Sequence, residues 1–522
     1  MRMNIKALGV AVFAALGLGA GGAHAATGAC ESLTNLKLPH VTITSATEVA
    51  AGAIVSGGPP AIPGYCKVMG TSRPTSDSDI RFEVAIPEGE AWNGRYLQVG
   101  NGGFAGAIPT PLISVGLRAG FAAAGTDDGH QSLVGTDASW ALNHPEKGID
   151  FGYRALKETT IAAKAIIAAY EGRAPRYSYF AGCSDGGREA LMEAQRYPDD
   201  FDGVLAGDPA NHWTHLLTAA AWNTQALTAT PGSAVPQAKL KVLEAAALKA
   251  CGDEDGIIEN PLVCKFDPTV VRCAGADQPD CLTGDQLTAV QKIYGGVINP
   301  RTGARIEDGY SPGGEAEGGG WAVWLTGSGA GDIHNTLMFG FGHNFFSYVV
   351  FSDPNYDIRK MNFDSDVAMF DAKSAPIYSS YDPDLSAFKK HGGKLIQFHG
   401  WADPAIPAKD SVTYFDSVQA KMGDTSGFYR LFMVPGMLHC GGGRGPNDVI
   451  LPALSALSTW VEKGEAPARI EAAHRAGSGL GAPGPVEFTR PVCPFPEVAL
   501  WDGKGDRKQA QSWRCTATKK RA

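Results

Sequence analysis

Patterns that mark several common classes of protein are missing from this chain. Its 522 residues contain neither a C-x-x-C pair nor an H-E-x-x-H motif, so closely spaced zinc ligands and the helix of a zinc peptidase are both absent. Lysine and arginine do not cluster outside the C-terminal tail "KKRA", and the formal net charge is -9, which argues against a nucleic-acid partner. Beyond the N-terminal segment, no apolar run is long enough to span a bilayer.

The N-terminus has the three parts of a secretory signal peptide. Arg2 and Lys6 precede an apolar run rich in glycine and alanine, and the cleavage signal "AHA" ends at Ala25. A transmembrane anchor is the less favoured alternative, because the run is short. We therefore expect residues 1–25 to be removed, which takes the formal charge from -9 to -11. The mature protein is expected to be secreted or periplasmic, without a membrane span.

Cysteine is present in an even number. All 10 cysteines follow the signal peptide: Cys30, Cys66, Cys183, Cys251, Cys264, Cys273, Cys281, Cys440, Cys493 and Cys515. An even count in an oxidising compartment indicates a disulfide framework. A zinc site in the cluster between residues 251 and 281 is the less favoured alternative, because structural zinc sites take closely spaced ligand pairs.

Strand-like and helix-like segments alternate near both ends of the mature chain. Four apolar runs end in glycine or polar residues, "GRYLQVGNGG", "RYSYFAG", "KLIQFHGWAD" and "YRLFMVPGMLHC", and "TTIAAKAIIAAY" is typical of a helix. This alternation predicts an α/β fold with a largely parallel sheet. It is lost in the middle of the chain, which also contains a glycine-rich stretch from Ser311 to Asp332. We expect a catalytic domain in two parts, residues 26–212 and 371–522, with a lid domain, residues 213–370, inserted between them.

Ser184 is the candidate nucleophile. It is the central residue of the G-x-S-x-G pattern "GCSDG", with a strand-like segment before it and the helix-like "GREALMEAQRY" after it. This is the context of a nucleophile elbow, in which glycines permit a sharp turn that lifts the serine hydroxyl above the sheet. A glycine-serine turn without chemistry is the alternative, so the motif needs partners.

A serine hydroxyl needs a base, and the base needs a carboxylate that orients it. In α/β hydrolases these partners follow the serine in the order acid, then histidine. Asp403 in "HGWADPAIP" and His439 in "VPGMLHCGGG" each come directly after a predicted strand, where a parallel sheet presents its carboxyl ends. Asp410 is a weaker candidate for the acid, because it lies farther from the strand end.

The oxyanion hole is expected from the backbone amide of Asp185, which follows the nucleophile, and from the loop "VGNGGFAG". Gly102 or Gly103 is the candidate donor in this loop, because glycine lets the backbone approach a substrate closely.

Cysteines flank both the candidate nucleophile and the candidate base. Cys183 precedes Ser184, and Cys440 follows His439. If the serine and the histidine meet, their neighbours are close as well, and a disulfide could join the two loops.

Six motifs in order, "TDDGH", "GCSDGGREAL", "GDPANHW", "HGWADPAIP", "MLHCGGG" and "CPFPEVALWDGKGD", resemble the tannase and feruloyl esterase family of secreted α/β-hydrolase serine esterases over nearly the whole mature chain. The resemblance implies a triad of Ser184, Asp403 and His439. It also implies the disulfides Cys183–Cys440, Cys30–Cys66, Cys251–Cys264, Cys273–Cys281 and Cys493–Cys515.

The family also carries a structural calcium ion in its lid. The loop "CGDEDGIIENP" offers Asp253, Asp255, the Ile257 carbonyl and Glu259, a composition suited to a hard, oxygen-bound cation. The family usually has an aspartate directly after the cysteine, where this chain has Gly252, so a solvated acidic turn is the alternative.

The resemblance implies hydrolysis of small aromatic esters, such as feruloyl or galloyl esters of plant polyphenols and cell walls, with no organic cofactor. Three alternatives stay open. The chain could hydrolyse mono(2-hydroxyethyl) terephthalate, as some relatives do, it could be a peptidase or lipase, or it could be an inactive secreted binding protein. The lid aromatics Trp321, Trp324, Phe345 and Phe346 are candidates to frame the acid's ring, or are ordinary core residues.

Overall fold

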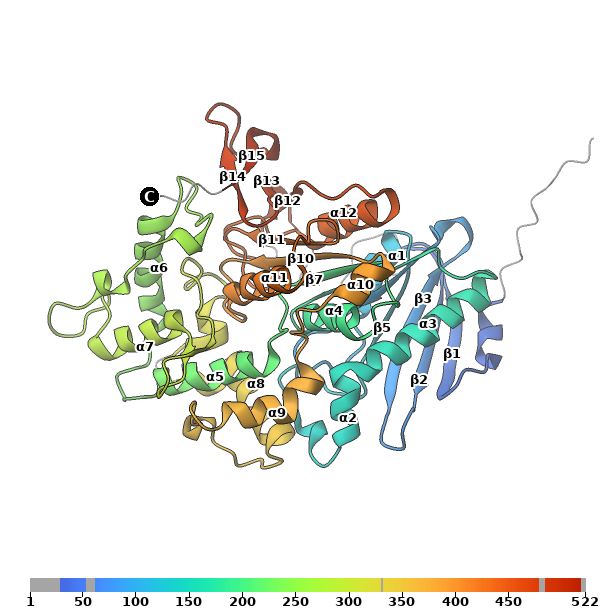
Figure 1. The fold of residues 1–522 in the computed structure, drawn as a ribbon, viewed down its shortest axis with the longest axis horizontal. Helices are drawn as coiled ribbons and strands as arrows, with labels where there is room; N and C mark the ends of the chain where they lie inside the picture. The colour runs from blue at the N-terminus through green and yellow to red at the C-terminus, as the bar shows by residue number, and fades with distance from the viewer. Residues whose placement is uncertain (1–28, 53–61, 330–331, 478–483, 518–522) are drawn as a thin grey trace, which may run out of the picture.

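The computed structural model describes residues 29–52, 62–329, 332–477 and 484–517, so the predicted signal peptide lies outside the described residues. Its largest element is a nine-stranded sheet with the strand order β1-β2-β3-β5-β4-β6-β7-β10-β11 (Figure 1). The strands are β1 (Val41–Val49), β2 (Tyr65–Ser72), β3 (Ile80–Pro87), β4 (Arg95–Val99), β5 (Ala122–Thr126), β6 (Tyr177–Cys183), β7 (Gly203–Gly207), β10 (Lys394–Gly400) and β11 (Tyr429–Val434).

The sheet is antiparallel at one edge and parallel elsewhere. Strands β1, β2, β3 and β5 pair antiparallel, whereas β5, β4, β6, β7, β10 and β11 are parallel neighbours. The expected α/β fold with a largely parallel sheet is confirmed by this topology. Because the parallel strands run in one direction, the loops that follow β6, β7, β10 and β11 gather at one edge of the sheet.

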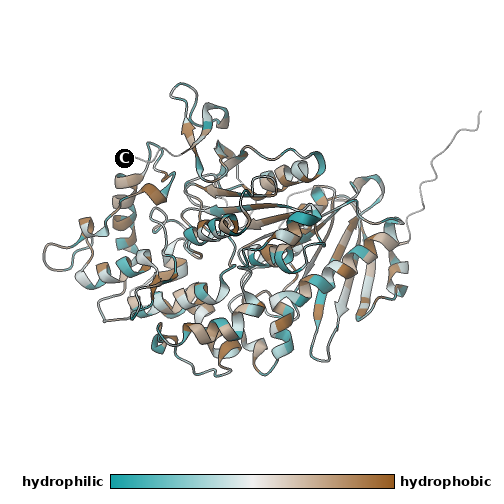
Figure 2. Cartoon of the chain, in the orientation of Figure 1, coloured by the Kyte–Doolittle hydropathy of each residue, from teal (hydrophilic) through white to brown (hydrophobic). Residues whose placement is uncertain are grey.

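Helices cover both faces of the sheet. Successive side chains of a strand point to opposite faces, and in the central strands both sets are apolar, so each face needs a cover. Phe180 of β6 packs in a core with α3 (Ala155–Glu171), α4 (Asp185–Arg196), α10 (Ser386–His391) and α11 (Ala408–Met422). Its neighbours Tyr179 and Ala181 pack in the opposite core with α1 (Thr110–Arg118) and α12 (Ile450–Lys463). Figure 2 shows hydrophilic and hydrophobic residues on these helices, as expected for helices with one buried face.

Apart from α10, which packs against the sheet, most of the chain between β7 and β10 forms the helical lid, in green, yellow and light orange in Figure 1. It contains α5 (Trp213–Leu227), α6 (Gln237–Cys251), α7 (Gly284–Gly295), α8 (Leu337–Asn344), α9 (Val367–Tyr378) and the short strands β8 (Val297–Ile298) and β9 (Arg305–Glu307). Its apolar core also includes Phe104 and Phe151 from the first part of the catalytic domain. Phe151 follows the short helix α2 (Pro145–Ile149). The lid boundary predicted at residue 370 falls inside α9.

Two antiparallel hairpins follow α12 at the C-terminal end. They pair β12 (Ile470–Arg475) with β13 (Val486–Val492), and β14 (Glu497–Trp501) with β15 (Trp513–Ala517). In Figure 1 they lie at the top of the view, above β11. No helix within the described ranges is both long enough and apolar enough to span a membrane.

Candidate active site

Ser184 lies at a sharp turn between β6 and α4. Its backbone has φ 66° and ψ -122°, an unfavourable region for a residue with a side chain. The flanking glycines make this turn possible, because a Cβ at Gly182 would lie 2.3 Å from the Gly186 carbonyl oxygen and one at Gly186 would lie 2.8 Å from the Asn101 carbonyl oxygen. The turn has the strand-serine-helix form of a nucleophile elbow.

The structure brings the three predicted triad side chains together. His439 Nε2 lies 2.8 Å from Ser184 Oγ, and His439 Nδ1 lies 2.8 Å from Asp403 Oδ2. A carboxylate only accepts hydrogen bonds, so in the neutral imidazole the proton is on Nδ1 and Nε2 is free to accept from the serine hydroxyl. This is the arrangement in which a histidine acts as a general base toward serine.

Asp403 is held by a second histidine that the sequence analysis did not single out. His399, at the end of β10, lies with Nε2 3.2 Å from Asp403 Oδ2 and 3.3 Å from the Ile406 carbonyl oxygen, so Nε2 carries a proton toward two acceptors. The backbone N–H groups of Ala405 and Ile406 donate to Asp403 Oδ1 at 2.7 Å and 3.0 Å. All four lone-pair directions of this buried carboxylate are therefore used.

The surroundings shift the pKa values of this pair in opposite directions. Burial opposes ionisation of Asp403, but the charge of His439 and the hydrogen bonds from His399 and His439 outweigh it and hold the pKa of Asp403 below its usual range. Burial likewise opposes protonation of His439, but the charges of Asp403 and Asp208 raise the pKa of His439 above its ordinary value of 6.5. The acid is thus ionised throughout the neutral range, and the base loses its proton at a higher pH than an ordinary histidine does.

The weaker candidate, Asp410, lies elsewhere. It is in the first turn of α11, where Tyr381 Oη donates to its Oδ1 at 3.0 Å and His212 Nδ1 lies at 3.6 Å. The described contacts of Asp410 do not include His439, so geometry distinguishes the two acids that the sequence left open.

Gly103 and Asp185 line a pocket together with Ser184 and His439, whereas Gly102 is exposed and does not line it. Gly103 has φ +62°, and a Cβ there would lie 2.5 Å from the Gly135 carbonyl oxygen, so the position requires glycine. Of the two glycines that the sequence proposed as donors, Gly103 is the better placed.

Asn101 holds this glycine loop against the elbow, a role that sequence reasoning missed. Its backbone N–H donates to Glu189 Oε2 at 3.0 Å, its side chain donates to Asp128 Oδ2 at 3.0 Å, and its carbonyl accepts from the Gly186 N–H at 2.8 Å. Asp128 belongs to the quoted motif "TDDGH", and Glu189 and Gly186 belong to "GCSDGGREAL". Two motifs far apart in sequence therefore fix one loop.

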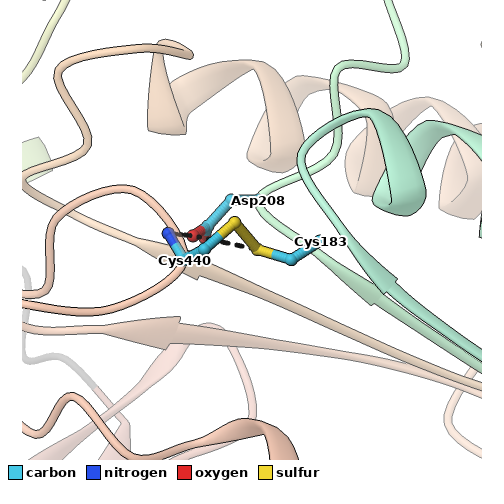
Figure 3. A group of neighbouring side chains, drawn as sticks. All are labelled: Cys183, Asp208 and Cys440. Carbon is cyan, nitrogen blue, oxygen red and sulfur yellow. Dashed lines mark hydrogen bonds between the residues drawn. A yellow bond between two sulfur atoms is a disulfide. The ribbon is translucent and has the colours of Figure 1, made fainter. Parts of the chain in front are cut away.

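A disulfide joins Cys183 to Cys440, with a Cα–Cα distance of 6.0 Å across a sequence separation of 257 residues. Figure 3 shows Asp208 beside it: its buried carboxylate accepts from the Cys440 N–H and, at 2.8 Å, from the Gly400 N–H. Asp208, in the motif "GDPA", was another residue without an assigned role. It connects the loop after β7 to the end of β10 and to the loop after β11, so it positions the histidine loop relative to the strand that leads to Asp403. Because both sulfurs are in the disulfide, neither is a thiolate that could bind a metal.

All five disulfides implied by the resemblance are present. Besides Cys183–Cys440, they are Cys30–Cys66, Cys251–Cys264, Cys273–Cys281 and Cys493–Cys515. The structure describes all 10 cysteines, and none is free.

The pocket above Ser184 is apolar. Apart from Ser184, Asp185 and His439, its lining consists of Gly103, Ala210, Trp213, Leu216, Leu217, Trp324, Met338, Phe341, Ala405 and Ile406. The Trp324 ring lies edge-on to the His439 ring, with centroids 5.0 Å apart. Of the four lid aromatics named from sequence, Trp324 lines the pocket, whereas Trp321, Phe345 and Phe346 belong to the buried core of the lid. The lid therefore presents an aromatic and aliphatic wall to the nucleophile.

The predicted calcium ligands lie in the loop after α6. The carboxylates of Asp255 and Glu259 contact arginine side chains from the C-terminal hairpins, and Asp253 Oδ1 accepts from backbone N–H groups of its own loop. These residues are absent from the pocket that contains Ser184.

Comparisons with known proteins concern the family and the fold. The model of the family described as "Tannase and feruloyl esterase" matches residues 66–516. The chain is 41% identical to an uncharacterized esterase of Xanthomonas campestris pv. campestris, covering 94% of this chain and 91% of that protein. It is 33% identical to mono(2-hydroxyethyl) terephthalate hydrolase of Piscinibacter sakaiensis, covering 94% and 92%. The crystal structure of feruloyl esterase B from Aspergillus oryzae matches with a TM-score of 0.83 at 27% identity, covering 93% of this chain and 99% of that one.

Proposed function

Because this chain belongs to the tannase and feruloyl esterase family, and is therefore a carboxylic-ester hydrolase, we propose that it is a serine esterase for esters of aromatic acids. In these substrates the acid carries no charged group besides the carboxyl that forms the ester. The observation that carries the proposal is the hydrogen-bonded series Ser184, His439 and Asp403 at the base of an apolar, aromatic pocket. The five disulfides and the predicted signal peptide support an enzyme that acts outside the cytoplasm.

The proposed reaction is two-step acyl transfer. His439 Nε2 takes the proton of Ser184 Oγ as the oxygen attacks the ester carbonyl, and Asp403 stabilises the imidazolium that forms. The backbone N–H groups of Asp185 and Gly103 donate to the oxyanion. His439 returns the proton to the leaving alcohol, and a water molecule, activated by the same histidine, then releases the aromatic acid and restores Ser184.

The lining of the pocket favours particular acids. Within the described residues that line it, there is no lysine or arginine to pair with a carboxylate, and a buried unpaired charge is costly. Aromatic and aliphatic side chains also offer few partners for several hydroxyl groups, whereas they suit a flat ring that carries few polar groups. Ferulic and related cinnamic acids fit this chemistry better than terephthalate or gallate.

A substrate panel tests this preference. We expect kcat/KM for methyl ferulate to exceed that for methyl gallate, and kcat/KM for mono(2-hydroxyethyl) terephthalate to be lower by at least roughly 10-fold than for its methyl ester, because the ester removes an unpaired charge. The two terephthalates differ only in that group, so each is the control for the other. Faster hydrolysis of the charged monoester would contradict the assignment and favour the terephthalate-hydrolase alternative. Absence of all hydrolysis, with Ser184 unreactive toward a fluorophosphonate, would favour the inactive binding protein.

The pH dependence tests the role of His439. The base must be neutral, and its pKa is raised, so kcat/KM should fall as the pH falls through a midpoint above 6.5. Asp208→Asn should move this midpoint to lower pH, because it removes a negative charge that raises the pKa of His439. The measurement is the pH profile of kcat/KM with a substrate that does not titrate.

Asp371→Asn is the matched control, because Asp371 pairs with His215 and its charge does not contribute to the pKa shift of His439. An acid limb that stays in place or moves upward in Asp208→Asn would refute the proposed electrostatic role.

A further inference from the structure

The acidic loop of the lid (residues 253–259) lies against two arginines from the C-terminal hairpins. Arg490, on β13, contacts Glu259 Oε1 through Nη1 at 2.7 Å and Asp255 Oδ2 through Nη2 at 2.6 Å. Arg507, between β14 and β15, contacts the same Asp255 Oδ2 through Nη2 at 3.0 Å, and its Nη2 lies 3.6 Å from Asp253 Oδ2. The two guanidinium groups therefore lie where the predicted ligands converge.

Arg490 is buried, and its guanidinium packs against an aromatic ring. It is 1% exposed, and its guanidinium carbon lies 4.0 Å from the centroid of the Trp513 ring. Arg507 lies over the same ring at 5.2 Å and over Trp501 at 4.8 Å. A guanidinium stays charged inside a protein, so its burial requires carboxylates around it. The acidic loop supplies them.

The residues present do not fit a calcium ion at this place. Calcium takes about 6 to 8 oxygen ligands at roughly 2.3–2.6 Å. Here Asp253 Oδ1 already accepts from the N–H groups of Asp255 and Ile257, and the Ile257 carbonyl accepts from the Asp253 N–H at 2.9 Å. A divalent cation among the remaining carboxylates would also be next to the fixed positive charge of Arg490.

The missing first ligand cannot be restored by a simple substitution. In the family pattern an aspartate follows the cysteine, but a Cβ at Gly252 would lie 2.6 Å from the Leu248 carbonyl oxygen. An aspartate at this position would therefore require the backbone at the end of α6 to shift.

We propose that Arg490 and Arg507 form an arginine clamp that replaces the lid metal ion, so that this protein folds and keeps its stability without calcium. The clamp joins the lid to the C-terminal hairpins across more than 230 residues of sequence, 231 from Glu259 to Arg490 and 252 from Asp255 to Arg507. A disulfide braces each side: Cys251–Cys264 closes the acidic loop, and Cys493–Cys515 joins the chain after β13 to β15. The positive charge that the acidic loop requires is therefore supplied by arginine side chains of the same chain.

Thermal unfolding of the mature protein tests the proposal without reference to its reaction. After treatment with excess EDTA, and in millimolar calcium chloride, the apparent Tm should agree within about 1 °C, because only a ligand that binds the native state raises Tm. Metal analysis of the untreated protein should find no stoichiometric calcium. One bound calcium per chain, or a saturable rise of Tm with calcium, would overturn the clamp.

Two substitutions test the arginines themselves. Arg490→Gln leaves Asp255 and Glu259 without their buried cation and should lower Tm by several degrees. Arg514→Gln is the matched control, because it removes an equal charge from an exposed position on β15 and should leave Tm unchanged within about 1 °C. An equal effect of both variants would refute the clamp. If Arg490→Gln does not fold, Arg507→Gln replaces it, since this side chain is 23% exposed and its loss is milder.

Discussion

Ser184→Ala is expected to abolish ester hydrolysis, with kcat lowered by roughly 10⁵- to 10⁶-fold. The side chain is the proposed nucleophile, and within the described contacts its hydroxyl pairs with His439 Nε2. Because alanine keeps the Cβ and loses one partly buried hydrogen bond, Tm should change by no more than about 2 °C. The measurements are single-turnover and steady-state hydrolysis of methyl ferulate, with Tm as the test of folding.

Ser458→Ala provides the control for a lost serine hydroxyl. Ser458 is also buried, but its hydroxyl donates to the Leu454 carbonyl within α12 and it does not line the pocket, so the kcat of this variant should stay within about 2-fold of the parent. Hydrolysis that persists in Ser184→Ala at more than about one per cent of the parent rate would be incompatible with a serine nucleophile at this position.

Asp403→Asn is expected to lower kcat by about 10⁴-fold without unfolding the protein. The local hydrogen bonds dictate how the new amide must lie. The N–H groups of Ala405 and Ile406 donate to Oδ1, so the amide oxygen takes that place and the NH₂ group takes the place of Oδ2. There it faces His439 Nδ1, which must become the acceptor. The proton then lies on Nε2, which can no longer accept one from Ser184.

Asp410→Asn is the matched control for this substitution. Asp410 is also a buried aspartate, but its contacts are to Tyr381 and His212, so kcat should remain within about 5-fold of the parent. Both variants are assayed by kcat and by the pH profile, because a change of imidazole tautomer alters the profile and a general loss of stability does not. A large loss of kcat in Asp410→Asn, together with a near-normal kcat in Asp403→Asn, would show that Asp403 is not the acid of the triad.

The Cys183–Cys440 disulfide has a clear structural setting. It joins the residue before the nucleophile to the residue after the histidine, and Asp208 accepts a hydrogen bond from the second cysteine's N–H. Burial raises the pKa of Asp208 to about 6, although the charges of His399 and His439 oppose this. The carboxylate is therefore ionised at neutral pH, where its charge reaches the base and its oxygens hold two loops in place.

Much of the catalytic domain could be predicted because its signals are local. The runs "KLIQFHGWAD" and "YRLFMVPGMLHC" contain β10 and β11, "RYSYFAG" contains all of β6 except Cys183, and "TTIAAKAIIAAY" lies within α3. Each is a continuous apolar or alanine-rich segment whose burial pattern follows from its own residues. The lid is harder to predict, since its apolar residues form a core only after the chain has folded back on itself.

Local constraints in the sequence specify the alternation of strands and helices, the glycines that permit the turn at Ser184, the even number of cysteines, and the order of serine, acid and histidine. The fold is needed to choose Asp403 over Asp410 and Gly103 over Gly102, and to show that Arg490 contacts the acidic loop. The physical reason is that a side chain's role depends on which atoms surround it. Asp208 and Arg490 contact residues that are distant in sequence, and His399 contacts Asp403 through the turn after β10. No local sequence pattern predicts these contacts.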